Sequence, residues 1–272
     1  MKKTMIFGVG MLSCLILGVL FFSPRVWAQK SFSRIGNTKT VTQMVPVSQA
    51  EVKLPLPEGG IRFRGRHTLF LNAKEGDQIK EKITSLQLGK YKHILNYILL
   101  DPSGDKIKAG RVPLKETGSI VEPAPKTGTY QLTVSTGSNA GYIEVDNRYY
   151  VVKTPVHVIR TRLKGYFYVP GGVGKFTVKI KGEGKGEFAG INIYDNMGNY
   201  IIKGDTTQGE GNKADIEVTV PEGSSGSIWS FKMYAPPTYS YEDAYFDGFS
   251  SKIPPYISIH QERMMKPAEE GK

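Results

Sequence analysis

The sequence predicts an all-β protein with two tandem antiparallel β-sandwich (jelly-roll-like) domains after a cleaved signal peptide. Three observations support this: an apolar N-terminal run, short alternating runs separated by turn signals, and a unit of about 100 residues that occurs twice. The predicted divisions are a signal peptide at 1–28, a basic arm or linker at 29–49, sandwich domains at 50–155 and 156–261, and a disordered tail at 262–272.

Residues 1–28 have the layout of a secretory signal peptide. Two lysines precede an uncharged, mostly apolar run at 4–22, and Val26-Trp27-Ala28 places small residues at the two positions that a signal peptidase reads. Cleavage there would leave Gln29 as the first residue of a secreted or periplasmic protein that does not span the membrane. The alternatives are an uncleaved anchor and a lipoprotein attached through Cys14, although Cys14 lies in the middle of the apolar run.

Composition narrows the classes of function. Cys14 is the only cysteine, so the mature chain would have no disulfide, thiolate zinc site or cysteine nucleophile. The chain has 36 Lys+Arg and 25 Asp+Glu; removal of residues 1–28 would leave an excess of +8, of which residues 29–66 supply +5. This uneven charge suggests an anionic partner such as a polysaccharide, lipid headgroup or cell wall, and a merely solvated basic face is the alternative. No nucleic acid partner is expected, because no nucleic-acid motif is recognisable.

From about residue 50 onward the sequence consists of short runs rich in Val, Ile, Tyr, Phe and Thr. Clusters of turn-forming residues separate these runs, as expected for strands of a sandwich. Examples of the runs are Thr68–Leu71, Tyr130–Val134, Tyr149–Val152 and Phe176–Ile180. No window predicts a convincing amphipathic helix.

The chain repeats itself at a nearly constant spacing. The turn Asp101–Gly104 corresponds to Asp195–Gly198, 94 residues later, and both predict a hairpin opened by Asp and closed near Gly. Two further correspondences lie at offsets of 97 and 99: Leu69–Leu71 with Tyr166–Tyr168, and Tyr130, Leu132 and Val134 with Trp229, Phe231 and Met233. We therefore expect a domain boundary near Thr154-Pro155, and Trp229 in the core of the second domain.

These segments also resemble known domains. In the first repeat, Leu99–Gly104 and Thr127–Val134 resemble the bacterial pre-peptidase C-terminal type of domain. The second repeat, with Gly165–Pro170 and Ile253–Ser258, resembles a β-sandwich domain of secreted bacterial proteins. The resemblance covers residues 60–260 and implies a non-catalytic appendage of the kind that in some proteins binds glycans.

A row of arginines is the first candidate binding site. Arg62, Arg64 and Arg66 alternate just before the first strand of the first repeat, which would place three positive charges on one face. The row has a counterpart in the second repeat: Arg160, Arg162 and Lys164. The two interpretations are a paired anion-binding surface and protection of an edge strand against aggregation.

An aromatic segment is the second candidate. Tyr239, Tyr241, Asp243 and Tyr245 alternate after Pro236-Pro237, and in an extended chain they would share one face. Tyrosine rings can stack on the apolar face of a sugar while the carboxylate accepts bonds from its hydroxyl groups. The alternative is that these side chains pack in the core.

The sequence does not predict an enzyme, a metal site or a cofactor. Its four histidines form no His-Glu-x-x-His motif, and no Gly-x-Ser-x-Gly turn is present. The loop at 204–215 offers oxygen ligands for calcium without the spacing of a calcium loop, and a polar hairpin loop is the alternative. We expect a non-catalytic exported binding module for polysaccharide or an anionic cell-envelope surface. A structural or assembly protein of the envelope that binds another protein is the alternative.

Overall fold

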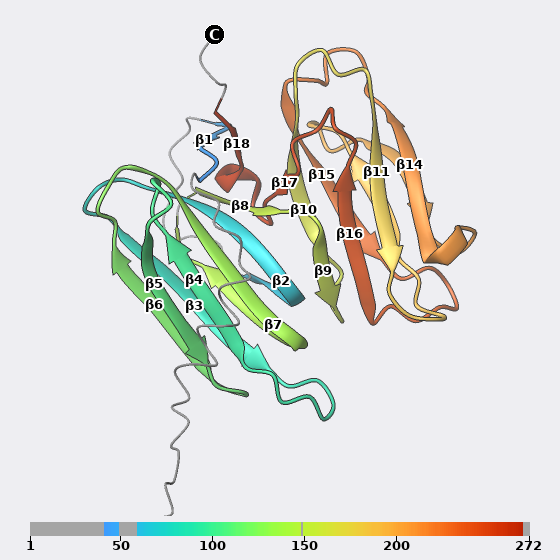
Figure 1. The fold of residues 1–272 in the computed structure, drawn as a ribbon. Coiled ribbons are helices and arrows are strands. Elements are labelled where there is room, and N and C mark those ends of the chain that lie inside the picture. The colour runs from blue at the N-terminus through green and yellow to red at the C-terminus, as the bar shows by residue number, and fades with distance from the viewer. Residues whose placement is uncertain (1–40, 49–58, 148, 269–272) are drawn as a thin grey trace, which may run out of the picture. The chain divides into compact units, whose positions relative to one another are not determined.

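The computed structural model describes residues 41–48, 59–147 and 149–268, and these residues form an all-β, antiparallel structure (Figure 1). The predicted signal peptide and most of the basic arm lie outside the described residues. The first strands are β1 (Met44–Pro46), β2 (Gly60–Ala73), β3 (Gln78–Leu86), β4 (Leu95–Leu100), β5 (Lys106–Val112), β6 (Thr117–Pro123), β7 (Gly128–Val145) and β8 (Tyr149–Lys153).

The remaining elements complete the sheets. They are β9 (Val156–Ile159), β10 (Lys164–Val169), β11 (Lys175–Gly182), β12 (Gly190–Tyr194), β13 (Tyr200–Asp205), β14 (Lys213–Thr219), β15 (Ser227–Tyr234), β16 (Asp243–Phe249), β17 (Tyr256–Ile257), β18 (Met265–Pro267) and the 3-10 turns η1 (Glu210–Asn212) and η2 (Gln261–Arg263). A long sheet runs in the order β14-β11-β16-β9-β2-β7-β3-β6, and a separate sheet has the order β10-β15-β12-β13. The described residues all belong to one compact unit.

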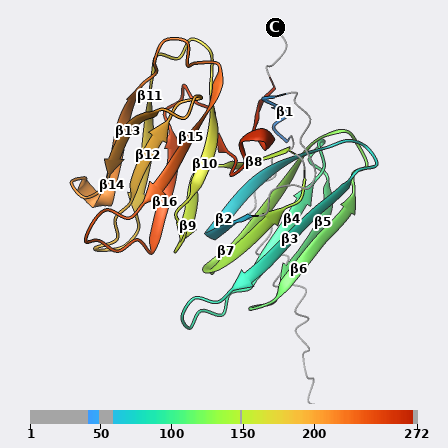
Figure 2. The same ribbon diagram turned by 180° about the vertical axis from the view of Figure 1, so that it is seen from behind.

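The pairing pattern of the first half recurs in the second. The order β2-β7-β4-β5 corresponds to β10-β15-β12-β13, and the pair β3-β6 corresponds to β11-β14. One difference is that the 18-residue β7 pairs with β4 through its first half and with β3 through its second half. In the second half of the chain, β15 pairs with β12 and β16 pairs with β11, so two strands make the pairings that β7 alone makes in the first half. Figure 2 shows β3, β6 and β7 side by side from behind. The division into domains at residue 155 stays a prediction.

A bulge bends β2 at Gly65. The register with β7 shifts between Arg64 and Arg66, and Gly65 has φ +83°, a conformation that side chains with a Cβ rarely adopt. Its N–H donates to Thr136 Oγ1 at 2.9 Å, which holds the bend. Because of this bulge, Arg66 is out of step with the alternation of Arg62 and Arg64.

The two predicted Asp–Gly turns have the same hydrogen bonds. Asp101 Oδ1 accepts from the N–H groups of Ser103 and Asp105, and Asp195 Oδ1 accepts from the N–H groups of Met197 and Asn199, all at 2.8–2.9 Å. The first turn joins β4 to β5 and the second joins β12 to β13. The prediction of equivalent hairpin turns is therefore confirmed.

Every second side chain along β7 and β15 faces the core. Trp229, Phe231 and Met233 of β15 are buried, as are Tyr130, Leu132 and Val134 of β7. The Trp229 indole N–H donates to the Ser224 carbonyl oxygen at 2.8 Å, so the one polar atom of this buried ring is satisfied. The predicted core face of this segment is confirmed.

The chain around β1 and β18 differs from the expectation. The sequence predicted an arm at 29–49 and a disordered tail at 262–272, but β1 pairs with β18 in an antiparallel two-stranded sheet. Val41, Met44, Met264 and Met265 are buried in a second apolar cluster with Phe70 of β2. These apolar side chains explain why the described parts of both segments pack onto the fold.

Candidate functional site

The two groups of candidate residues, the arginine row and the tyrosine segment, contact each other at the carboxylate of Asp243. Arg64 of β2 donates from Nη1 to Asp243 Oδ2 at 2.6 Å, although the two residues are 179 positions apart in the sequence. His157 of β9 bonds through Nε2 to the other oxygen, Asp243 Oδ1, also at 2.6 Å. We call Arg64, His157, Asp243 and Tyr245 the Asp243 centre.

The strands place these side chains by simple alternation. On β16 the side chains of Ala244 and Phe246 enter the core, so Asp243 and Tyr245 point to the opposite face. His157 lies opposite Tyr245 in the antiparallel pair β9–β16. The two rings stack with centroids 3.9 Å apart and planes inclined by 22°.

Two more side chains extend the centre. Lys181 of β11 lies opposite Tyr245, with its Nζ 4.9 Å from the centre of the tyrosine ring. Arg64 also has its Cζ 5.9 Å from the centre of the Tyr91 ring, and Tyr91 is 45% exposed. The centre therefore combines charged hydrogen-bonding groups with one exposed ring, that of Tyr91, and with the half-buried Tyr245 ring, which His157 and Lys181 contact.

The electrostatics keep Asp243 ionised. Burial raises the pKa of the Asp243 carboxyl, but the hydrogen bond and charge of His157 and the charge of Arg64 outweigh it, so the pKa is lowered overall. Burial, with the negative charges of Glu183 and Asp243, raises the pKa of Tyr245 to about 12, which keeps its hydroxyl neutral. The centre thus offers an ionised acceptor and a neutral hydroxyl.

His67 forms a hydrogen bond with the backbone of Arg64. Its ring Nε2 lies 2.8 Å from the Arg64 carbonyl oxygen; since a carbonyl oxygen can only accept, the ring must donate from Nε2. Burial lowers the pKa of His67 to about 4, so the ring is neutral at physiological pH. His67 is a positioning residue for the backbone that carries Arg64.

The arginine row forms only in part. Arg62 and Arg64 are half-buried, and only Arg66, beyond the bulge, is exposed. β2 is not a free edge at Phe63, between Arg62 and Arg64, because it pairs there with β7 on one side and with Val158 of β9 on the other; β8 pairs with it only at Leu69–Asn72. Sequence alternation could not reveal this, since it does not state which strands lie beside a given strand.

The counterpart row in the second repeat is not an alternating strand. Arg160 lies on a bend with φ +51° and bonds to Glu242 at 3.1 Å. Residues 160–163 are not in a strand, and β10 begins at Lys164. The expectation of two equivalent arginine faces is therefore wrong.

The side chains of the tyrosine segment do not all lie on one face. Tyr239 is exposed in a turn, with its ring centroid 4.4 Å from that of Phe188. Tyr241 packs against the core, with its hydroxyl 3.7 Å from Met233 Sδ. Only Asp243 and Tyr245 share a face, because β16 begins at Asp243 and the preceding residues are not extended in the sheet. The predicted four-residue platform is therefore wrong.

Sequence reasoning missed His157, Tyr91 and Lys181 as parts of this site. His157 had a local signal, since it is the polar residue between the buried Val156 and Val158. The contact of Arg64 with Tyr91 had none, because it depends on which strands become neighbours.

Polar groups of the loop at 204–215 form hydrogen bonds with other groups of the protein. Asp205 Oδ1 accepts from the Thr207 N–H and hydroxyl, and the Asn212 amide donates to the carbonyl oxygens of Gly184 and Glu187. Within the described ranges, no group of three or more His, Cys, Asp or Glu residues is placed to hold a metal ion.

No helix in the part of the chain that the structure describes is long and apolar enough to cross a membrane.

Comparison with known proteins adds no relative: no protein-family model matches this chain, and no curated sequence matches it.

Proposed function

We propose that this chain is an exported, non-catalytic binding module made of two tandem β-sandwich domains, and that it binds a polysaccharide of the cell envelope. The repeated strand pairing and the equivalent Asp101 and Asp195 turns support the tandem arrangement. The resemblance to the pre-peptidase C-terminal type of domain is consistent with a binding role and is part of the proposal.

The observation that carries this proposal is the Asp243 centre. Asp243 is held between two donors, and a carboxylate has about four lone-pair positions, so it retains capacity to accept bonds from sugar hydroxyls. The half-buried Tyr245 lies on the same face with its ring against His157 and Lys181, and the exposed Tyr91 ring lies near Arg64. Aromatic rings next to fixed hydrogen-bonding groups are typical of sites for polar ligands that have apolar faces.

The charges favour a neutral saccharide over an anionic one. The positive charge of Arg64 is compensated by Asp243 at 2.6 Å, and Arg66 alone of the three arginines is exposed. A ligand held by stacking and short hydrogen bonds should be retained at high salt, whereas attraction between exposed charges is screened within about 3 Å at 1 M salt.

The same electrostatics argue against acid–base catalysis at this centre. A general base works best when its pKa lies near the operating pH, and the pKa of Asp243 is lowered away from that range. Asp243 is therefore proposed as a hydrogen-bond acceptor for the ligand.

A retention assay tests this proposal. Purified exported protein would be applied to immobilised neutral glucan, to acidic polygalacturonate and to whole envelope polysaccharide, in 0.1 M and 1 M salt. We expect retention on a neutral or envelope polysaccharide that persists at 1 M salt. Retention that collapses with salt would favour the anionic surface, and the absence of retention on every matrix would favour the structural or assembly protein.

A further inference from the structure

The outer surface of the sheet β10-β15-β12-β13 is a second candidate binding surface (Figure 2). Trp229, Phe231 and Met233 of β15 point inward and are buried, so the residues between them point outward, and the same alternation holds along β10 and β12. We call six outward residues the tyrosine–lysine face: Lys164, Tyr166, Tyr194, Tyr200, Lys203 and Lys232.

Three tyrosines form a row across the four strands. Tyr166 lies opposite Ser230, and Ser230 lies opposite Tyr194. Neighbouring strands are about 4.8 Å apart, so the backbones of Tyr166 and Tyr194 are about 10 Å apart, with the small Ser230 side chain between them. Tyr200 lies opposite Tyr194, and the centroids of these two rings are 6.1 Å apart.

The tyrosine row is partly accessible to a ligand. Tyr200 is 55% exposed, and Tyr166 and Tyr194 are half-buried. In the part of the chain that the structure describes, neither apolar cluster includes any of these three tyrosines. Tyrosine rings on a sheet surface offer apolar faces on which sugar rings can stack, while their hydroxyl groups stay in water.

Three lysines form a second row beside the tyrosines. Lys164 lies opposite Lys232, which is opposite Asn192, and Asn192 lies opposite Lys203. All three lysines are exposed, and among the described residues none of them forms an ion pair with a carboxylate. The Lys164 Nζ lies 5.4 Å from the centre of the Tyr166 ring. The row therefore carries three positive charges that no carboxylate of the protein compensates.

The outer surface of β11 and β14, in the other sheet, provides a comparison. There Lys175 pairs with Glu217 at 3.0 Å, and Lys179 pairs with Asp215 at 3.7 Å. The charges of these lysines are compensated within the protein. The lysines of the tyrosine–lysine face have no such partner, so their charge is available to an anionic ligand.

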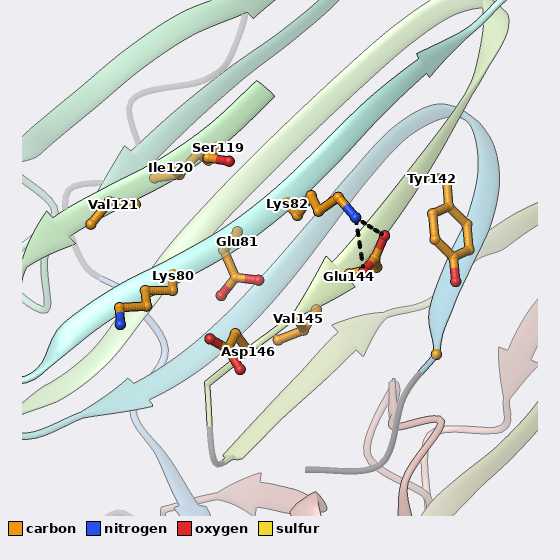
Figure 3. A pocket seen from close by; sticks show the side chains of 11 residues that line it. Lys80, Glu81, Lys82, Ser119, Ile120, Val121, Tyr142, Glu144, Val145 and Asp146 are labelled. Carbon is orange, nitrogen blue, oxygen red and sulfur yellow. Dashed lines mark hydrogen bonds and ion pairs between the residues drawn. The ribbon is translucent and has the colours of Figure 1, made fainter. Parts of the chain in front are cut away.

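A hollow of about 760 Å³ over β3, β6 and β7 is less suitable for an anion (Figure 3). Lys80, Lys82, Tyr142 and Glu144 line it, and Lys82 pairs with Glu144 at 3.1 Å. Asp146 also lies at its wall. Positive and negative side chains therefore balance one another in this hollow.

We infer that the tyrosine–lysine face binds an acidic polysaccharide, whose sugar rings stack on the tyrosine row while its carboxylates pair with the lysine row. The inference goes beyond the proposed function, because the Asp243 centre lies on the other sheet and takes a neutral saccharide. A lipid surface fits this face less well. Helices that bind at a membrane surface place Trp, Phe or Leu beside their basic residues, and none of these points outward on the four strands.

Binding of polygalacturonate at 0.1 M salt tests this inference. The full chain carries Tyr245→Ala, so that the Asp243 centre does not contribute. Methyl-esterified polygalacturonate has the same sugar rings without the charge, and polyglutamate has the charge without the rings. We expect polygalacturonate to bind, and each of the other two polymers to bind at least about tenfold more weakly. At 1 M salt, where charges are screened within about 3 Å, the binding should be lost.

Matched variants locate the binding on the molecule. The double variant Lys203→Gln and Lys232→Gln should bind polygalacturonate about tenfold more weakly. The double variant Lys175→Gln and Lys179→Gln removes the same charge from β11 and should leave binding unchanged. Tyr194→Ala should also weaken binding about tenfold, because it interrupts the tyrosine row.

Several results would overturn the inference. They are an equal loss in the two lysine double variants, unchanged binding by a folded Tyr194→Ala variant, equal binding of polyglutamate or of the methyl ester, and no binding of polygalacturonate. Tighter binding to vesicles of phosphatidylglycerol and phosphatidylcholine would assign the face to a lipid surface instead. Retention of the Lys203→Gln and Lys232→Gln variant, with Tyr245 intact, on neutral polysaccharide at 1 M salt reports on the Asp243 centre, so the two sites can fail independently.

Discussion

Asp243 joins strands that are distant in the sequence, and at the scale of single residues this pairing should contribute to stability. Asp243→Asn would leave the Arg64 guanidinium, whose side chain is 23% exposed, without its carboxylate partner. Removing one member of a fully buried pair costs about 3–5 kcal/mol; because Arg64 is partly exposed, we expect a loss of about 2–4 kcal/mol in the free energy of unfolding. Urea denaturation measures this loss.

A matched control is available on the surface. Asp215 and Lys179 also form an ion pair, at 3.7 Å, but the Asp215 side chain is 65% exposed. Asp215→Asn should change stability by less than about 0.5 kcal/mol. Equal effects of the two substitutions would show that the Asp243 centre is an ordinary surface pair.

Glu81 gives the stability a pH dependence of known sign. Burial raises the pKa of Glu81 well above its usual value, and the charge of Arg263 compensates only in part. The folded protein therefore holds this proton more tightly than the unfolded chain does. The stability that results is fully present below the unfolded pKa of about 4.5 and is lost as the pH rises toward the folded pKa.

Glu81→Gln removes this titration. The melting temperature of the variant, relative to that of the wild type, should be higher at pH 7.5 than at pH 4.5. Thermal melts at the two pH values measure the difference. A difference that does not change with pH, or that changes in the opposite direction, would show that Glu81 is ionised in the folded protein.

At the scale of elements, the paired hairpin turns provide a comparison within one chain. Asp101→Ala and Asp195→Ala each remove an acceptor for two backbone N–H groups, and each should cost about 1–3 kcal/mol. Each has one further side-chain bond, Asp101 to Lys126 Nζ at 2.9 Å and Asp195 to Asn199 Nδ2 at 3.0 Å, so the two replacements should cost similar amounts. A loss of stability at only one of the two sites in urea denaturation would contradict the equivalence of the turns.

The core of β15 gives a simpler prediction. Trp229 is fully buried and contacts Phe167 and Phe176, so Trp229→Ala should cost about 3–5 kcal/mol. Denaturation by urea measures the loss. A melting transition unchanged by this substitution would be incompatible with the core described above.

These elements also show what the sequence could and could not predict. The turns at Asp101 and Asp195 and the buried face of Trp229 were predictable, because turn chemistry and alternation act over a few residues. The bulge at Gly65 and the pairing of β1 with β18 were not. The bulge needs Thr136, 71 positions away, and β1 needs a partner near the other end of the chain.

The candidate site was predictable only in parts, for the same reason. Local alternation identified Arg64, Asp243 and Tyr245 as candidates, but assigned them to separate surfaces. These three side chains lie close together only because β16, β9 and β2 are adjacent in one sheet. The pairing of Arg64 with Asp243 follows from the same neighbours, and it is the reason why we propose a neutral saccharide in place of an anionic surface.

At the scale of the whole molecule, the central claim is that the Asp243 centre binds a saccharide through stacking and hydrogen bonds. The most direct test is the dissociation constant for the retained polysaccharide at 1 M salt, measured for the wild type, Tyr245→Ala and Tyr239→Ala. Tyr239 is the matched control, because it is an exposed tyrosine from the same segment that lies outside the centre. We predict at least about tenfold weaker binding for Tyr245→Ala, equivalent to about 1.4 kcal/mol, and no change for Tyr239→Ala. Unchanged binding by a folded Tyr245→Ala variant, or an equal loss in both variants, would contradict this account.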